Sequence, residues 1–156
     1  MITPRLQEFL DAQSAIYTHK THRTTFTAKD LAEADHMPPW EVAKTVVFVG
    51  DGVFAIAVVP ACARVDLEEL RAKLGLRTIR LATEGELEQL FPDAELGAMP
   101  PFGNLYDNIP VYVDATLANE ETIAFNAGTH RDVVHMKFKD YKHYVHPAIL
   151  SFAFPA

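Results

Sequence analysis

Two almost wholly apolar segments, residues 42–49 and 53–59, dominate the hydrophobic pattern of the chain. The intervening Gly50-Asp51-Gly52 is typical of a tight turn, so these segments are predicted to form a hairpin of strands buried on both faces. Short runs rich in β-branched and apolar residues, bounded by turn residues, predict further strands. They lie at residues 16–21, 77–82, 111–113, 122–125 and 133–138.

Helical periodicity and capping residues predict four helices between these strands. Thr3-Pro4 would begin the first helix and Thr27 the second, which Pro38-Pro39 ends. The pairs Asp66 with Glu69 and Thr83 with Glu86 have the spacing of capping boxes that begin two more. Alternating helices and strands predict a single α/β (α+β) domain over residues 1–156, with flanking helices and a mixed sheet of about six or seven strands.

The segment Gly97-Ala98-Met99-Pro100-Pro101-Phe102-Gly103 has a different character. Its glycines and prolines exclude a helix or a central strand, and its apolar residues predict a rigid, packed loop. Free N–H groups at Gly97, Ala98 and Gly103 could form an oxyanion hole or bind a carboxylate. The alternative is an irregular loop with a purely structural role.

Lys44 shares one face of its predicted strand with Val42, Val46 and Phe48. An ammonium group on an apolar face is costly unless it faces a cavity or a partner. A functional lysine here would bind an anion or a carbonyl oxygen, or act as a base with a lowered pKa. The alternative is a lysine at the end of a strand whose ammonium group reaches water past its neighbours.

A turn, Asn126-Ala127-Gly128-Thr129-His130, precedes the predicted strand at 133–138. On that strand His135 points to the face opposite Val134 and Met136. His135 could orient a substrate or shuttle a proton, or it could be an ordinary surface histidine.

Other chemistries have little support in the sequence. His19-x-x-His22 and His143-x-x-His146 have metal-ligand spacing only on a helix, and no carboxylate or cysteine joins them at zinc-site spacing. Cys62 has only Arg64 as a nearby base, and neither serine stands in a G-x-S-x-G setting. Phosphate-binding glycine motifs are also missing from the sequence. We therefore expect no metal and no cofactor.

The composition narrows the class of protein. A chain of 156 residues, 49% apolar, is the size of one globular domain with a core and a ligand pocket. A single cysteine suits a reducing compartment, and neither a signal sequence nor a membrane-spanning run is evident, so a cytoplasmic protein without membrane contact is expected. A net charge of −7 argues against a general nucleic-acid coat and against DNA as a partner.

Three of these features, taken in order, resemble one known family. They are Lys44 at the start of the hairpin, the G-x-x-x-P loop that continues as Pro-Phe-Gly, and the Asn-Ala-Gly turn. Together they resemble the YbaK/EbsC family of aminoacyl-tRNA deacylases, which includes the editing domain inserted in bacterial prolyl-tRNA synthetases. The resemblance covers roughly residues 15–145. It implies a mixed sheet curled around a small pocket, and hydrolysis in trans of the ester that joins a wrong amino acid to the tRNA 3′ adenosine.

The resemblance also implies site residues. Lys44 matches the lysine on which activity depends, and Gly97 and Pro101 match the loop whose backbone amides hold the aminoacyl end, so Gly103 and Ala98 are expected there too. His135 is similar to a pocket histidine of the inserted domains, with His130 as its competitor. Asn126 and Gly128 are expected to contact substrate, and Val46, Met99 and Phe102 to form the pocket walls. The neighbouring ribose hydroxyl of the tRNA would help to activate water.

The amino acid removed stays open among alanine, cysteine, serine, threonine and small analogues, because Thr24-Thr25-Phe26-Thr27 and His130-Arg131-Asp132 depart from the cysteine- and alanine-specific patterns. A binding module of the same fold is the alternative to an enzyme. The expected partner is the acceptor end of an aminoacyl-tRNA, alone or with a synthetase. Two stretches are expected to form a local basic face for that end. They hold Arg64, Arg71, Lys73, Arg77 and Arg80, and Arg131, Lys137, Lys139 and Lys142.

Overall fold

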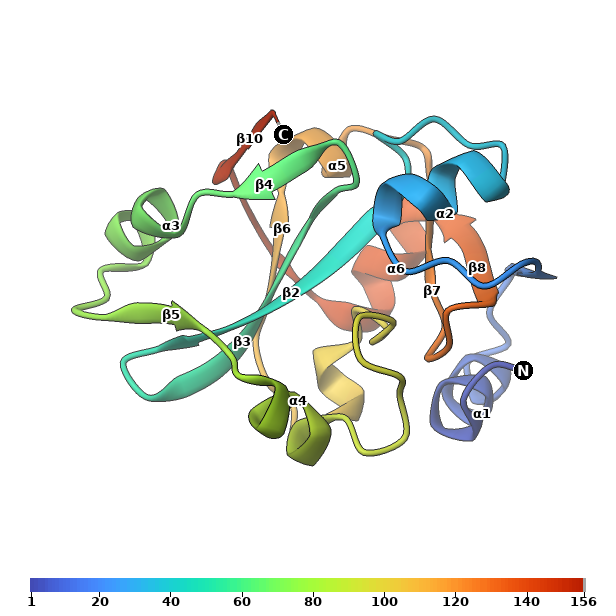
Figure 1. Cartoon of the computed structure of the whole chain (residues 1–156), viewed down its shortest axis with the longest axis horizontal. Coiled ribbons are helices and arrows are strands. Elements are labelled where there is room, and N and C mark those ends of the chain that lie inside the picture. Colours follow the sequence, from blue (N-terminus) through green and yellow to red (C-terminus); the bar gives the residue numbers. More distant parts are fainter. Residues whose placement is uncertain (156) are drawn as a thin grey trace.

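The computed structural model describes residues 1–155 and shows a mixed α/β fold (Figure 1). The described residues form six α-helices, one 3-10 turn and ten strands. The predicted fold class is confirmed. The strands, however, are not gathered in the single sheet of six or seven that was expected. They are divided among sheets of five, three and two strands, with antiparallel and parallel neighbours in the largest.

The five-stranded sheet is built around the predicted hairpin, which runs diagonally through the centre of Figure 1. Strands β2 (Ala43–Gly50) and β3 (Val53–Pro60) pair antiparallel across the glycine turn. Strand β5 (Ile79–Leu81) pairs antiparallel with β2 at one edge. On the other side β6 (Val111–Asp114) runs parallel to β3, and β9 (Ala148–Leu150) runs parallel to β6.

A three-stranded antiparallel sheet lies beside it, in the order β1 (Thr18–Thr21), β8 (Asp132–Lys137) and β7 (Thr122–Asn126). An isolated parallel bridge between Val42 and Ala124 joins β7 to the start of β2. The two sheets therefore meet where the hairpin begins, which is where Lys44 lies.

The remaining strands are short. β4 (Ala63–Val65) pairs antiparallel with β10 (Ala153–Pro155). Neither was predicted, and neither was β9; β5 is equally short, but it lies within the longer run at residues 77–82 that predicted a strand.

The four predicted helices are present with their caps, apart from the first. Thr27, Asp66 and Thr83 each accept a hydrogen bond from a backbone N–H in the first turn, and Thr83 with Glu86 completes a capping box. The box predicted for Asp66 and Glu69 is only half formed, because the N–H of Asp66 donates to the carbonyl of Phe152. Thr3 precedes the first helix, but its side chain makes no capping bond. Two helices were not predicted, and Phe138 begins one of them instead of ending a strand. The helices are α1 (Pro4–Ala12), α2 (Ala28–Ala34), α3 (Leu67–Leu74), α4 (Glu84–Leu90), α5 (Ala115–Ala118) and α6 (Phe138–Val145), with a 3-10 turn at Gly103–Leu105.

Three apolar clusters hold these elements together. The largest lies between α1, α6, the hairpin and the three-stranded sheet, with Leu6, Phe102 and Phe125 at its centre. A second packs α3 and Phe152 against the hairpin side chains that point the other way. A small third cluster places α2 across the joint between the sheets, through Leu31, Val42, Ala124 and others. Because α2 lies over this joint, a cavity is left between the start of the helix and the two sheets.

Candidate functional site

A cavity of about 500 Å³ lies between the start of α2, the start of β2, the turn from β3 to β4 and the loop at residues 97–103. It collects residues from five separate parts of the chain. Five of the predicted site residues line it, Lys44, Val46, Gly97, Met99 and Asn126. The others that line it are Phe26, Thr27, Ala28, Lys29, Ala43, Thr45, Ala61 and Arg64.

Lys44 is held in the cavity by strand β4. Its backbone pairs with Val59 of β3, and its half-buried side chain reaches across to β4, where Nζ donates a hydrogen bond of 2.7 Å to the carbonyl of Ala63. This lysine therefore has both the partner and the cavity that its apolar strand face required. Burial lowers the pKa of Lys44, and the nearby charges of Arg64 and Lys29 lower it further.

The loop at residues 97–103 presents its first part to the cavity. Gly97 has a positive φ of 83°, and a Cβ there would lie 3.2 Å from Cε1 of His130. Its N–H points to the sulfur of Met99 at 3.2 Å. Because a thioether is a weak acceptor, a ligand oxygen could replace this contact. Gly97 is thus the backbone amide of the loop that can face a ligand.

The rest of this loop is structural, contrary to expectation. The N–H of Ala98 is engaged by the carbonyl of Glu95 at 3.0 Å, so it cannot serve a substrate. Pro101 accepts a 2.6 Å hydrogen bond from the buried Tyr141 hydroxyl, and Phe102 is fully buried among other aromatic rings. A Cβ at Gly103 would lie 2.2 Å from the carbonyl oxygen of Ile109. None of these four residues lines the cavity; they anchor its wall.

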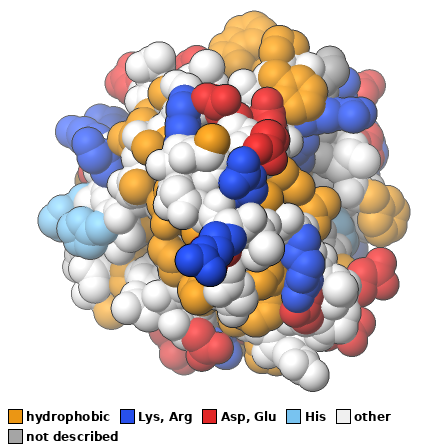
Figure 2. Space-filling model, turned by 90° about the vertical axis from the view of Figure 1, so that its left-hand side faces the viewer, with side chains coloured by type: hydrophobic (Ala, Val, Ile, Leu, Met, Phe, Trp, Pro, Cys, Tyr) orange, Lys and Arg blue, Asp and Glu red, His pale blue; other side chains and the backbone are white. Residues whose placement is uncertain are grey.

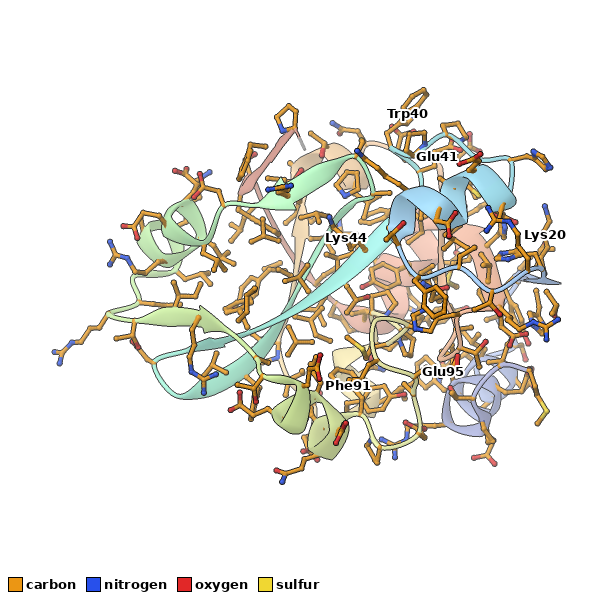
Figure 3. All side chains as sticks on the ribbon, viewed as in Figure 1. Lys20, Trp40, Glu41, Lys44, Phe91 and Glu95 are labelled. Atoms are coloured by element: carbon orange, nitrogen blue, oxygen red, sulfur yellow. The ribbon has the colours of Figure 1, made fainter. Side chains whose placement is uncertain are left out.

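Gly128 and His130 support the loop from behind instead of lining the cavity as expected. The N–H of Gly128 donates to the carbonyl of Ala98, and its carbonyl accepts from the N–H of Glu95. His130 is 9% exposed, and its Nε2 lies 2.6 Å from the carbonyl of Leu96, which requires the proton on Nε2. Glu95, labelled in Figure 3, also accepts from the backbone N–H of His130. The Asn-Ala-Gly turn and the glycine loop are therefore one packed unit.

His135, expected as a pocket histidine, is not among the residues that line the cavity. It sits on β8, and its Nε2 lies 2.6 Å from Oδ2 of the buried Asp35 at the end of α2. Burial lowers the pKa of His135, while the charge of Asp35 opposes that effect. The pair fastens the last turn of α2 to the three-stranded sheet. His135 is therefore an anchor for the helix whose first turn lines the cavity.

The cavity is positively charged. Lys29, Lys44 and Arg64 line it, and within residues 1–155 no carboxylate, histidine, cysteine or serine does. Asn126 contributes an amide whose Oδ1 is buried without a hydrogen-bond partner in the protein. Three cations and an unsatisfied amide suit an anionic ligand with additional polar groups.

Arg64 and Lys29 differ in how far the sequence predicted them. Arg64 belonged to the first basic stretch, so its charge was noted although its place was not. Lys29 carried no pattern, because only the docking of α2 over the sheet joint brings it to the cavity.

Most residues of the two basic stretches do not gather on the local basic face that was expected. Arg71 pairs with Glu68, Lys73 with Glu69 at 3.2 Å, and Arg80 with Glu86 at 2.8 Å. Figure 2 shows basic and acidic side chains interspersed at the end of the molecule where α3 and β5 lie. Lys137, Lys139 and Lys142 line a separate groove together with Glu120 and Glu121. Of the first stretch only Arg64 lines the cavity.

No cluster of three or more histidine, cysteine or acidic side chains that could hold a metal ion occurs in the described part of the chain. His19, one of the paired histidines of the sequence, instead lies 2.7 Å from the buried carboxylate of Asp132. Over the same residues, no helix has the length and apolar character needed to cross a membrane.

Comparisons with known proteins give one family match, which covers most of the chain. A family model described as an aminoacyl-tRNA editing domain matches residues 22–144, which include all the cavity-lining residues. No curated protein is similar enough in sequence to be matched.

Solved structures share the fold at low identity. A crystal structure of the hypothetical protein APE2540 has a TM-score of 0.86 at 18% identity, with 96% of this chain and 99% of that chain covered. A protein provisionally described as a trans-editing enzyme for prolyl tRNA synthetase has a TM-score of 0.86 at 23% identity, with 97% and 96% covered. A provisionally described signal transduction protein from Marinobacter aquaeolei VT8 has a TM-score of 0.74 at 19% identity, with 96% and 30% covered.

Proposed function

The chain belongs to the aminoacyl-tRNA editing domain family, and on that basis we propose that it hydrolyses the ester of mischarged aminoacyl-tRNAs, with the aminoacyl 3′ end bound in the cavity around Lys44. The observation that carries the proposal is the convergence of Lys44, Gly97 and Asn126, from three distant segments, on one cationic cavity. The reaction adds water across the ester bond and releases the free amino acid and the tRNA 3′ end.

Lys44 is proposed to place positive charge where the oxyanion develops. One of its three N–H groups is used by the carbonyl of Ala63, which fixes the direction of the ammonium and leaves two donors for substrate. Preorganised donors of this kind stabilise a tetrahedral intermediate, and one such donor is worth about 10²–10³ in rate. The lowered pKa of Lys44 is consistent with an ammonium that is poorly hydrated before substrate binds.

The N–H of Gly97 and the amide of Asn126 are proposed to complete the polar wall. His130 bonds to the carbonyl of Leu96, the residue before Gly97, and this restrains the loop, so the N–H of Gly97 would need little reorganisation during the reaction. Asn126, at the end of β7, can either donate to the ester or accept from the amino group of the substrate, because a side-chain amide does both.

Water activation is assigned to the substrate. Within the described chain, the side chains that line the cavity include no histidine, cysteine, serine or carboxylate to act as a strong base or nucleophile. As the family resemblance implies, the neighbouring ribose hydroxyl of the tRNA would help to activate the water. The protein then supplies orientation and charge, and no covalent intermediate forms.

Selectivity is proposed to depend on the size of the cavity. Val46 and Met99 form apolar parts of its wall, while Phe102, once expected beside them, belongs to the core behind. A wall of this kind distinguishes side chains by size, since one methylene changes binding by about 1–3 kcal/mol. As the family resemblance implies, small amino acids are the expected substrates, and an aminoacyl-tRNA, with or without its synthetase, is the expected partner.

The test is deacylation of tRNAs charged with alanine, serine, threonine or cysteine, with wild type compared with Lys44→Ala. We expect at least one of the four to be cleared far faster than in buffer by wild type and not by Lys44→Ala. Lys73→Ala is the matched control, because Lys73 pairs with Glu69 outside the cavity. Binding of these tRNAs without clearance of any of them would instead identify a non-catalytic binding module.

A further inference from the structure

We propose that Trp40 and Arg64, here called the Trp40 shelf, bind the unpaired nucleotides that precede the 3′ adenosine of the tRNA. The shelf rests on the proposed function, since it extends the same site outward. It assigns the part of the substrate that the cavity itself cannot hold. A cavity of about 500 Å³ has the volume of a site for one small-molecule ligand, so the rest of the strand must leave across the rim.

Trp40 is exposed without an evident structural reason. It is the only tryptophan of the chain and is 52% exposed, although tryptophan is a large residue that usually packs. Figure 3 shows it extending outward from the loop between α2 and β2. Pro38 and Pro39 restrict this loop, and the N–H of Glu41 donates to the carbonyl of Pro38. The ring is therefore presented on a rigid turn.

That turn is fastened to the rim of the cavity. The carbonyl of Pro39, the residue before Trp40, accepts a hydrogen bond of 3.1 Å from the N–H of Ala61, which lines the cavity. Arg64 follows three residues later, in β4, and also lines the cavity. A strand that leaves the cavity over Ala61 would therefore pass between Arg64 and the loop that carries Trp40.

The chemistry of this rim is that of a site for single-stranded nucleic acid. Such sites combine cations that follow the phosphates with aromatic rings on which bases stack. Lys29, Lys44 and Arg64 supply the cations, and Phe26, 72% exposed at the cavity, supplies a second ring. Glu41 is the carboxylate next to Trp40 in the chain and is half-buried. The unpaired end of a tRNA offers both phosphates and unstacked bases, which a folded protein partner does not.

The first test uses the fluorescence of Trp40, which reports on this position alone because no other tryptophan is present. The probe is an RNA hairpin with an unpaired ACCA 3′ tail, and the control is the same hairpin with a blunt end. We expect the tailed RNA to quench the emission with saturation and the blunt RNA to quench it far less. Equal quenching by both, or none by either, would overturn the proposal.

The second test separates the shelf from the chemistry in the cavity. Trp40→Ala is compared with wild type on an aminoacyl-tRNA and on the corresponding 3′-aminoacyl adenosine, which has no preceding nucleotides. We expect kcat/KM to fall roughly 5- to 150-fold on the tRNA, the range for loss of one base–aromatic stack, and to change little on the adenosine ester. Trp40→Phe should retain most activity, and Leu81→Ala, which removes an exposed side chain on β5, should be unchanged.

The outcomes distinguish the two proposals. Hydrolysis of both substrates with no specific loss on tRNA in Trp40→Ala rejects the shelf and keeps the proposed function. Hydrolysis of neither substrate by wild type rejects the proposed function, and the quenching experiment then decides the shelf by itself.

Discussion

Gly128 offers the sharpest test of how the glycine loop is held, through the substitution Gly128→Ala. Its φ is 95°, and a Cβ added there would lie 2.0 Å from Cγ2 of Thr3. Thr3 cannot simply move away, because its N–H donates to the carbonyl of Ala127 and α1 begins at the next residue. The substitution therefore adds both backbone strain and a steric overlap.

The two contributions can be sized separately. An L residue in the left-handed region costs about 1–2 kcal/mol, and overpacking typically costs about 1–3 kcal/mol. Together they predict that Gly128→Ala lowers the free energy of unfolding by about 2–5 kcal/mol, if the two terms add. For a domain of this size each kcal/mol corresponds to about 2–4 °C in Tm.

The assay is a double-mutant cycle by thermal and urea unfolding. Thr3→Ala removes both side-chain atoms that meet the new methyl group first, and its hydroxyl has no hydrogen-bond partner to lose. We expect the double variant to recover about 1–3 kcal/mol relative to the sum of the single changes, because the overlap is relieved while the strain remains. Additive effects, or a Gly128→Ala protein as stable as wild type, would show that Thr3 does not restrict position 128.

The same variant should also lose activity. Gly128 bonds to both Glu95 and Ala98, so its displacement moves Gly97 at the cavity wall. A fall in kcat at temperatures where the variant is fully folded would show that the turn positions the loop.

Three further predictions concern charge, pH and the loop anchor. Arg64→Ala should weaken binding of aminoacyl-tRNA and reduce the slope of log affinity against log salt by about 0.7, the value for one phosphate contact to a single strand. Arg71 pairs with Glu68, so the control variant Arg71→Ala should change neither the affinity nor the slope. His135 has a lowered pKa in the folded state, so as the pH falls the unfolded chain binds a proton at this histidine before the folded chain does. The stability that depends on His135 is therefore full above about pH 6.5 and decreases as the pH falls below that value. His135→Gln should flatten this dependence in urea titrations at several pH values. Tyr141→Phe leaves the buried carbonyl of Pro101 without its 2.6 Å donor and should destabilise the protein by about 1–3 kcal/mol in chemical denaturation; a change under 0.5 kcal/mol would show that the bond does not anchor the loop.

Local sequence features predicted the parts of the fold that depend on few residues. The hairpin follows from two apolar runs and a glycine turn, and the caps at Thr27, Asp66 and Thr83 follow from a side chain and an N–H three residues apart. The strands β4, β9 and β10 could not be predicted, because three residues become a strand only when a distant partner pairs with them. Pairing between distant strands also decides which strands share a sheet, so the strands expected in one sheet are divided among three.

The sequence likewise predicted only those site residues that stand out from their local surroundings. Lys44 and Gly97 were identifiable because each breaks a local rule, a charge on an apolar strand face and glycine in a rigid loop. The role of Ala98 depends on which carbonyl its N–H meets, and that of His135 on Asp35 at the end of a separate helix. Lys29 is the clearest omission, since only packing of α2 brings it to the cavity.

The proposed function depends on the charge of Lys44, which accelerates hydrolysis of an aminoacyl ester in this cavity. The most direct measurement is the single-turnover rate constant of the best aminoacyl-tRNA substrate at saturating enzyme, for wild type, Lys44→Ala and Lys44→Arg. We predict a wild-type rate constant far above that in buffer and a loss of about 10²–10³ in Lys44→Ala, with partial retention in Lys44→Arg. A Lys44→Ala enzyme that matches the wild-type rate constant at saturation would show that this charge plays no part in the hydrolysis.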